Sequence, residues 1–415
     1  MRLVQVFIPE GKRESVLSVL NAERIDYAVW DETGRQKFEA LVQFPVPVIG
    51  VEPILDKLRK AGIRKDAYTI VLAPEAVISE STETLNKRYP GERISREELI
   101  ARAEELAPAI STYFSLLILS TAIATAGLLL DSAATIIGAM VIAPLMGPAI
   151  STSVGTVIYD RKLASRGLAL QITGLLVAVI IAALIGLLVE HLNLLPYGFD
   201  IRGISQIEER TNPNFRSLFL ALGSGIAGAL SIIRNAGSAL VGVAIAAALV
   251  PPAATAGLGF AFGHPEVAII AIVLVLVNVL AINLSALILL WISGFRPSKT
   301  WAIGPARASV ASHVLVIIVA IAALSTVLGF ISYVSSQTAL IEQQAKLEVS
   351  AAVNESEERG MRLVTEDINV EYRPLDLFLN RSANVTVVLY HDAEQPVPLG
   401  IAQQIDDRLT KFTGR

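Results

Sequence analysis

Two short apolar stretches that end in proline decide the fold of this chain. Residues 135–148 read Thr-Ile-Ile-Gly-Ala-Met-Val-Ile-Ala-Pro-Leu-Met-Gly-Pro. Residues 241–252 read Val-Gly-Val-Ala-Ile-Ala-Ala-Ala-Leu-Val-Pro-Pro. Each stretch lacks charge and spans several helical turns, but its prolines cannot donate the backbone hydrogen bond that a helix interior needs. The pattern predicts buried helices that are interrupted near their middle.

Apolar sequence continues on both sides of these stretches. The 415 residues are 53% hydrophobic and 17% charged, and of the 34 basic and 38 acidic residues only 17 lie within 109–334. A helix of about 20 apolar residues crosses a bilayer. Seven segments reach that length, which is too many in succession for the buried helices of a soluble protein. The predicted segments are 109–130, 132–158, 164–189, 216–233, 236–258, 267–293 and 309–333.

The charges of the short loops predict the orientation of these segments. Basic residues follow the second segment (Arg161 and Lys162), the fourth (Arg234) and the sixth (Arg296 and Lys299), whereas the loops after segments one and five have none. Cytoplasmic loops are enriched in Lys and Arg. The N-terminus is therefore predicted in the cytoplasm and, after seven crossings, the C-terminus outside.

The apolar region repeats itself at a spacing of 104 residues. Segments one to three then fall on segments four to six without a gap, so each repeat crosses the membrane three times. An odd number of crossings forces the second copy to enter from the opposite side, which is the inverted-repeat plan of many secondary transporters. The identical pairs are Gly138 with Gly242, Ala143 with Ala247, Leu145 with Leu249, Pro148 with Pro252, Ala149 with Ala253, and Gly155 with Gly259.

Proline occupies matching places in the middle segment of each repeat. Pro144 and Pro148 flank Gly147 in the first copy, and Pro251 precedes Pro252 in the second. Each proline frees the carbonyl four residues earlier, and free backbone groups at membrane depth must face protein or a water-filled cavity. We expect both helices to break and to converge on a midplane binding site. Its candidate residues are Pro144, Gly147, Pro148, Ser151, Thr152, Pro251, Pro252, Thr255 and Asn278.

Other interpretations of these residues stay open. Proline kinks are common in membrane helices and need no binding site. Re-entrant hairpins would also explain the breaks, but they would move the Arg161–Lys162 loop to the outside. Asn278, whose counterpart in the first repeat is Gly174, could equally form hydrogen bonds between helices.

Asp131 and Arg234 precede the middle segments of the two repeats at nearly equivalent positions. An inverted arrangement puts Asp131 at the outer end and Arg234 at the inner end, so we expect no ion pair between them. A carboxylate at a helix N-terminus and a positive-inside anchor are the ordinary roles of such residues. A part in gating is the alternative.

Catalytic and cofactor chemistry has no visible set of residues. The segment interiors contain no Asp or Glu, so the sequence does not support a carboxylate proton relay through the membrane. Cysteine is absent, and the four histidines, at 191, 264, 313 and 391, share no metal-ligand spacing. No basic stripe suits a nucleic acid. We therefore expect neither an enzyme, nor a metal site, nor a cofactor.

Both ends of the chain have the composition of ordinary globular domains. The predicted order of elements in residues 1–75 is βαββαβ, a cytoplasmic ferredoxin-like domain. Residues 76–108 are a linker and an amphipathic connector helix, which Ser95 and Glu98 begin as a capping box. The remaining divisions are repeat one (109–189), an extracytoplasmic loop (190–215), repeat two (216–293), a basic cytoplasmic loop with the seventh helix (294–334) and an extracytoplasmic α+β region (335–415).

The last region is predicted to contain strands at 367–372 and 384–390 and a helix at 398–412. Because no closing strand follows, the chain is either truncated or has its sheet completed by another subunit, and we expect a homo-oligomer. The predicted fold class is an α-helical polytopic membrane protein. It has an inverted 3+3 transmembrane repeat, a seventh helix and two small α+β domains.

Residues 135–148 together with 241–252 resemble the signature segments of a prokaryotic membrane family. This is the domain-of-unknown-function 389 family, also called the uncharacterised hydrophobic domain. Residues 210–214, Arg-Thr-Asn-Pro-Asn, are similar to a further motif of the family. The resemblance covers about 109–293, and the N-terminal domain looks like one that many members carry. It implies a location in the prokaryotic inner membrane and no particular activity.

The sequence favours a transporter that moves a small solute or ion across the lipid bilayer by alternating access through the midplane site. Half-helix N-termini favour anions and freed carbonyls favour cations, so the charge of the solute stays open. An ion channel and a membrane sensor that signals through the N-terminal domain are the alternatives.

Overall fold

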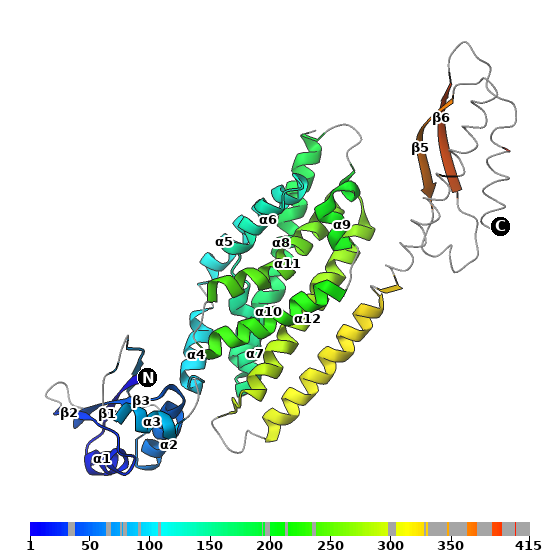
Figure 1. Ribbon diagram of the computed structural model, residues 1–415. Helices are drawn as coiled ribbons and strands as arrows, with labels where there is room; N and C mark the ends of the chain where they lie inside the picture. The colour runs from blue at the N-terminus through cyan, green and yellow to red at the C-terminus, as the bar shows by residue number, and fades with distance from the viewer. Residues whose placement is uncertain are drawn as a thin grey trace. The chain divides into compact units, whose positions relative to one another are not determined.

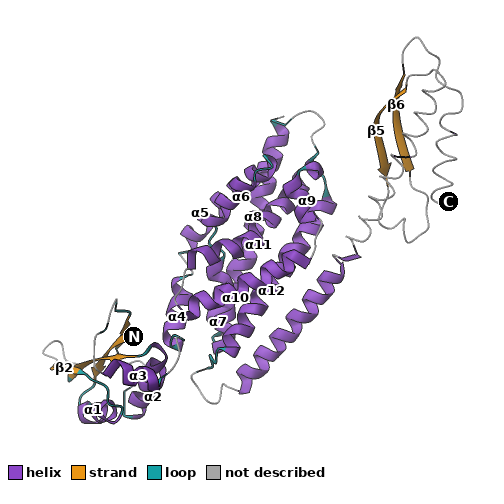
Figure 2. Ribbon diagram, in the orientation of Figure 1, coloured by secondary structure: helices purple, strands orange, loops and turns teal. Residues whose placement is uncertain are grey.

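A computed structural model divides the chain into two compact units, Met1–Ala322 and Ala323–Arg415, which are described separately. Helices dominate, and a small sheet lies near the N-terminus (Figure 2). The structure describes residues 1–31, 38–63, 68–74, 77, 81–89, 93–106, 109–192, 194–195, 200–211, 215–234, 238–297, 304–327, 329–330, 347, 363–371, 384–391 and 403.

The N-terminal domain has the predicted order βαββαβ. Its elements are β1 (Arg2–Ile8), α1 (Arg13–Ala22), β2 (Ala28–Asp31), β3 (Ala40–Val46), η1 (Val48–Gly50), α2 (Val51–Lys60) and β4 (Thr69–Leu72). The strands form an antiparallel sheet in the order β2-β3-β1-β4. Buried and half-buried residues alternate along β1 and β3, as in strands with one face on a core. Leu20 of α1 and Leu58 of α2 share that core with Phe44.

Two further helices, α3 (Ser81–Arg88) and α4 (Arg96–Glu105), lead from this domain toward the apolar region. Leu85 of α3 is buried in the core of the sheet, so the packed domain extends past the predicted end at residue 75. The hydroxyl of Ser95 accepts a hydrogen bond from the backbone N–H of Glu98 (3.2 Å), as the predicted capping box requires. The buried face of α4 belongs to the core of the helical bundle.

Apolar helices form that bundle (Figure 1). Six helices of the described residues are long and apolar enough to cross a membrane, and the bent pair α6–α7 makes the predicted seven if it forms a single span. The bounds are α5 (Ile110–Leu129), α6 (Ala133–Ile142), α7 (Met146–Ile158), α8 (Arg161–His191), η2 (Ile201–Gly203), α9 (Ser205–Thr211), α10 (Phe215–Arg234), α11 (Ser238–Ala261), α12 (Pro265–Ile292) and a last helix, Gly304–Val327.

The two middle segments differ in a way that the sequence does not predict. The first is broken, because α6 and α7 are separated by residues 143–145 and bent by 51°. The second is continuous, since α11 runs without interruption through Pro251 and Pro252. The prediction that both helices break is therefore wrong for α11. Asn278 contacts one of the carbonyls that the prolines of α11 leave without a donor.

The turns that follow α7 and α11 have the same structure at positions 104 residues apart. The N–H of Asp160 donates to the carbonyl of Gly155 at 2.8 Å, and the N–H of His264 donates to the carbonyl of Gly259 at 2.8 Å. Each turn also has one residue in the left-handed region, at equivalent positions. These residues are Tyr159 (φ 62°) and Gly263 (φ 69°).

The second unit contains an antiparallel hairpin of β5 (Leu363–Glu371) and β6 (Asn384–His391). The register pairs Leu363 with His391 and Glu371 with Asn384. Both strands overlap the strands predicted from the sequence. The predicted helix at 398–412 lies outside the described residues, apart from position 403.

Candidate functional site

The break between α6 and α7 lies inside the bundle. Residues 143–145 leave the helix, with Ala143 in an extended conformation (φ −65°, ψ 122°). Helix α7 starts among packed side chains, where Gly147 and Pro148 are buried. Pro148 stands in the first turn of α7, where its missing N–H removes no helical hydrogen bond. The break predicted at Pro144 is thus present, and the positive dipole end of α7 lies in the protein interior.

The two hydroxyl residues after the break bond to backbone carbonyls. Thr152 donates to the carbonyl of Pro148 at 2.8 Å. Ser151 donates to the carbonyl of Ala103 at 2.8 Å and so ties α7 to α4. Both were predicted as site residues, but their hydroxyl hydrogens are used within the protein, which leaves only oxygen lone pairs for a ligand.

A side chain of α12 supplies one of the two donors that helix α11 loses at its prolines. Pro252 has no N–H, which frees the carbonyl of Ala248. The buried side-chain amide of Asn278 donates to that carbonyl at 2.8 Å. The carbonyl of Ala248 therefore has a donor without any opening of the helix, and the predicted break at Pro251 and Pro252 is absent.

Two buried oxygens of the α11–α12 pair have no hydrogen-bond partner among the described residues. They are the side-chain carbonyl of Asn278 and the hydroxyl of Thr255, on residues that are 1% and 0% exposed. A buried polar group without a partner costs roughly 1–3 kcal/mol, and such a group is a candidate contact for a ligand or ion. Within the described residues, no group of three or more His, Asp or Glu side chains could hold a metal ion.

A reciprocal amide pair joins α8 to α12. Gln171 donates to Asn283 at 3.2 Å, and Asn283 donates back at 3.0 Å. Both residues are buried. The sequence shows them as rare amides within apolar segments, a common sign of function in membranes. It does not show that they pair, since they are 112 residues apart.

Asp131 lies between α5 and α6 and caps another helix. Its carboxylate accepts hydrogen bonds from the hydroxyl of Ser205 (2.8 and 2.9 Å) and from the N–H of Gln206 (3.0 Å), at the start of α9. These bonds, that of Ser205 above all, hold the pKa of Asp131 below its ordinary value. Arg234 is the last residue of α10. The carbonyl of the preceding residue, Ile233, accepts a hydrogen bond from the N–H of Ile94 (3.3 Å).

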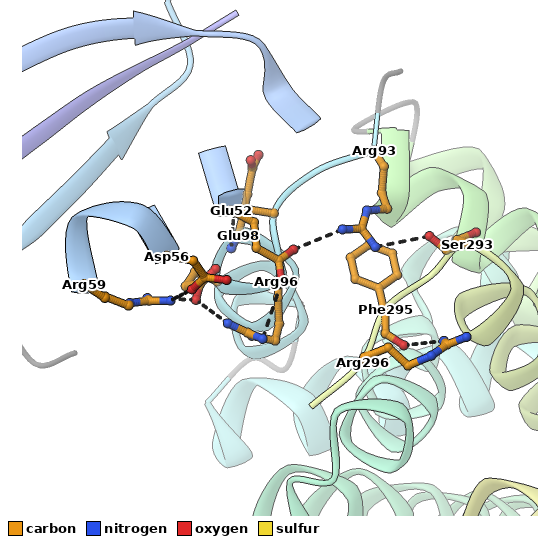
Figure 3. A network of polar contacts seen from close by, with 11 residues as sticks. Glu52, Asp56, Arg59, Arg93, Arg96, Glu98, Ser293, Phe295 and Arg296 are labelled. Carbon is orange, nitrogen blue, oxygen red and sulfur yellow. Dashed lines mark hydrogen bonds and ion pairs between the residues drawn. The ribbon is translucent and has the colours of Figure 1, made fainter. Parts of the chain in front are cut away.

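Ion pairs join the N-terminal domain to the bundle, in a network that we call the domain joint (Figure 3). Arg93 binds Glu52 of α2 at 3.0 Å and donates to the carbonyl of Ser293, just after α12, at 3.2 Å. Its guanidinium lies over the ring of Phe295, 4.5 Å from the centroid. Arg96 of α4 adds a contact to Glu52 at 3.4 Å. No local motif marks these residues, so the sequence did not predict the joint.

The carboxylate of Glu97, in the domain joint, makes the stability of the joint depend on pH. It lies between Arg59 of α2 (3.0 Å) and Arg96 of α4 (2.9 Å). Burial raises the pKa of Glu97, but the guanidinium groups of Arg96 and Arg59 lower it further, so the pKa lies below its ordinary 4.5. The ionised carboxylate thus stabilises the fold above that value, and this stability is lost as the pH falls through the lowered pKa.

We therefore expect Glu97→Gln to lower the thermal unfolding midpoint of the purified protein at about pH 7, and to lower it progressively less as the pH falls below the ordinary pKa of 4.5. Glu14→Gln, at an exposed position of α1, is the control and should leave the midpoint unchanged at each pH. A Glu97→Gln midpoint equal to that of the wild type at about pH 7 would show that the joint does not depend on this carboxylate.

Known proteins that match the chain define its family. The family described as a domain of unknown function, DUF389, matches residues 140–284, which hold the α6–α7 break, α11 and most of α12. An uncharacterised protein of Methanocaldococcus jannaschii is 31% identical over 301 residues, which are 72% of this chain and 90% of that protein. No solved structure matches the chain. The chain belongs to the DUF389 family of membrane proteins.

Proposed function

We propose that this protein transports a small solute or ion by alternating access, with two inverted repeats, α5–α8 and α10–α12, that move against each other. The observation that supports the proposal is a pair of equivalent contacts, in which the middle helix of each repeat touches the last helix of the other. Ser153 of α7 donates to the carbonyl of Asn283 on α12 at 3.3 Å. The counterparts at the spacing of 104 are Gly257 of α11 and Val179 of α8, and a Cβ on Gly257 would lie 2.4 Å from the Val179 carbonyl oxygen.

This pair of contacts supports a pseudo-two-fold axis between the repeats. The middle helix of each repeat contacts the last helix of the other at equivalent residues, as two-fold symmetry requires. With three spans in each repeat, the axis would lie in the membrane plane. Ile94 and Arg93 contact the residues at the C-terminal ends of α10 and α12, which supports a cytoplasmic position for both ends.

The start of α7 is the proposed binding site. Pro144, Gly147 and Pro148 form the break there, and the helix end supplies positive dipole within the protein. In the second repeat α11 is intact, so Asn278 and Thr255 supply acceptor oxygens in place of opened backbone. Because the first middle helix is broken and the second is continuous, the two repeats would differ in function. The pair α6–α7 can bend at its break, whereas α11 stays rigid and packs beside it.

Accessibility labelling tests this mechanism, because the chain contains no cysteine. Single cysteines at Lys162 and Arg234 should react with a membrane-impermeant maleimide only from the cytoplasmic side, and a cysteine at Leu130 only from outside. Met146→Cys, at the break, should react from both sides, since alternating access opens the site to each in turn. The measurement uses inside-out and right-side-out vesicles.

Two outcomes would contradict the proposal. Labelling of the Lys162 and Arg234 positions from different sides would exclude the inverted repeat. Labelling of Met146→Cys from one side only, with the control positions behaving as expected, would exclude alternating access.

A membrane sensor is the second candidate, and the domain joint favours it because the joint couples the N-terminal domain to the end of α12. Flux through the purified protein in liposomes, tested with a panel of inorganic anions and cations, separates the candidates. Saturable, gradient-coupled accumulation favours a transporter, and uncoupled flux favours a channel. Absence of flux, with conformational changes of the N-terminal domain that Arg93→Gln abolishes, favours a sensor.

A further inference from the structure

A cavity of about 120 Å³ opens between α4, α7 and α8, at the end of the bundle where α8 begins. A water molecule occupies about 30 Å³ in the liquid, so the cavity has room for a group of several heavy atoms. Its charged lining residues are Glu104 of α4 and Asp160, Lys162 and Arg166 at the start of α8.

Three of these charges are available to a ligand. Lys162 and Arg166 lie one helical turn apart, and neither forms an ion pair with a described residue. Glu104 likewise forms none within the described part of the chain. Asp160 is engaged as the N-cap of α8, since it accepts from the backbone N–H groups of Lys162 and Leu163, each at 3.0 Å. The cavity thus holds two cations and two carboxylates, of which that of Asp160 is engaged by backbone N–H groups and that of Glu104 is not.

The floor of the cavity is closed toward the α6–α7 break. Gly167 lies so close to α7 that a Cβ there would be 2.6 Å from the hydroxyl of Thr152 and 2.8 Å from the carbonyl of Pro148. Ser151 is 2% exposed, and its hydroxyl is bonded to the carbonyl of Ala103. A ligand therefore enters from the membrane surface or the aqueous phase, not from the proposed transport site.

Beyond the cavity, α8 exposes a row of large apolar side chains. Leu168, Ile172, Leu176 and Ile180 follow one another at helical spacing and are 44%, 52%, 57% and 54% exposed. In a bilayer such a row contacts acyl chains. A molecule with a charged head in the cavity and an apolar tail along α8 uses both features.

We propose that this cavity binds the headgroup of a phospholipid that carries a primary amine. The phosphate lies between Lys162 and Arg166, which hold it by charge-assisted hydrogen bonds, and the ammonium group donates to Glu104. The lining of the cavity has no net charge, with Lys162 and Arg166 against Glu104 and Asp160, and so matches the zwitterionic headgroup of an ethanolamine phospholipid. Glu104 adds selectivity, because a trimethylated amine cannot donate a hydrogen bond and a headgroup without an amine leaves the carboxylate unpaired.

Native mass spectrometry of the purified full-length protein tests this site, with dioleoyl phosphatidylethanolamine, phosphatidylglycerol and phosphatidylcholine as probes. The wild type should bind the ethanolamine lipid about two- to fivefold more tightly than the other two, as expected for an ion pair of the exposed Glu104. Lys162→Gln combined with Arg166→Gln should weaken binding of all three. Glu104→Gln should abolish the preference for the ethanolamine lipid without weakening binding of the glycerol lipid.

Arg161→Gln is the matched control, because this neighbouring guanidinium lies over the ring of Tyr159, 5.7 Å from its centroid, and does not line the cavity. An equal effect of Arg161→Gln, or equal binding of the three lipids by the wild type, would overturn the proposal. Competition by soluble phosphoethanolamine as strong as that by the lipid would also overturn it in favour of a soluble ligand. The site does not depend on transport, so either proposal can fail alone.

Discussion

Replacing Asn278 by leucine is expected to lower the free energy of unfolding by about 1–3 kcal/mol, the cost of leaving a buried carbonyl without a donor. That carbonyl belongs to Ala248 and accepts from Asn278 at 2.8 Å. In a Pro252→Ala background the N–H of residue 252 is restored and can donate to Ala248 within the helix. There Asn278→Leu should cost little or even stabilise, because it removes an oxygen without a described partner.

The four proteins form a double-mutant cycle, with an expected coupling of about 1–2 kcal/mol between positions 252 and 278. Thermal unfolding midpoints in detergent provide the measurement. Asn283→Leu is the control, since it breaks the amide pair with Gln171 and should cost the same in both backgrounds. Absence of coupling would mean that Asn278 does not cap the freed carbonyl.

The same contact shows part of the reason why the sequence predicted one middle helix correctly and the other wrongly. Prolines reveal which carbonyls lose their donor, but a helix opens only when no other donor reaches them. Around Pro144 a glycine and a second proline follow within one turn, and the helix breaks. At Pro252 the donor is a side chain of α12, 30 residues from Ala248. Nothing near Pro252 in the sequence indicates that donor.

Features set by neighbouring residues were predictable, and features set by distant residues were not. The alternating pattern of the strands, the length of the apolar segments and the N-cap at Ser95 all depend on local sequence. The strands, the apolar spans and the connector helix lie where these patterns predict them. The domain joint has no local signal, since Arg93 and Ser293 are 200 residues apart. The break between α6 and α7 was therefore predictable. Thr255 and Asn278 could be named as candidates from the sequence, but the contact of Asn278 with Ala248 required knowledge of which helices touch.

Alanine at Gly155 and alanine at Gly259 are expected to destabilise the protein by similar amounts. A Cβ on Gly155 would lie 2.4 Å from the backbone nitrogen of Ala164, and a Cβ on Gly259 would lie 2.6 Å from that of Ala268. Both obstacles are backbone atoms, which cannot rotate away as a side chain can. Each variant must therefore separate the middle helix of its repeat from the last one, at a cost of roughly 1–3 kcal/mol.

The repeat also supplies a matched control for these variants. Gly138 and Gly242 are another pair at the spacing of 104, but a Cβ on Gly138 meets nothing within 4 Å, and one on Gly242 meets only Met146, at 3.9 Å. Alanine at either position should stabilise the protein by about 0.5–1 kcal/mol, because it stiffens a helix interior. Thermal midpoints of the four variants thus test the equivalence of the repeats without any knowledge of the solute. Effects of opposite sign for Gly155→Ala and Gly259→Ala would show that the helix pairs α7–α8 and α11–α12 are not equivalent. That result would contradict the inverted repeat on which the transport proposal depends.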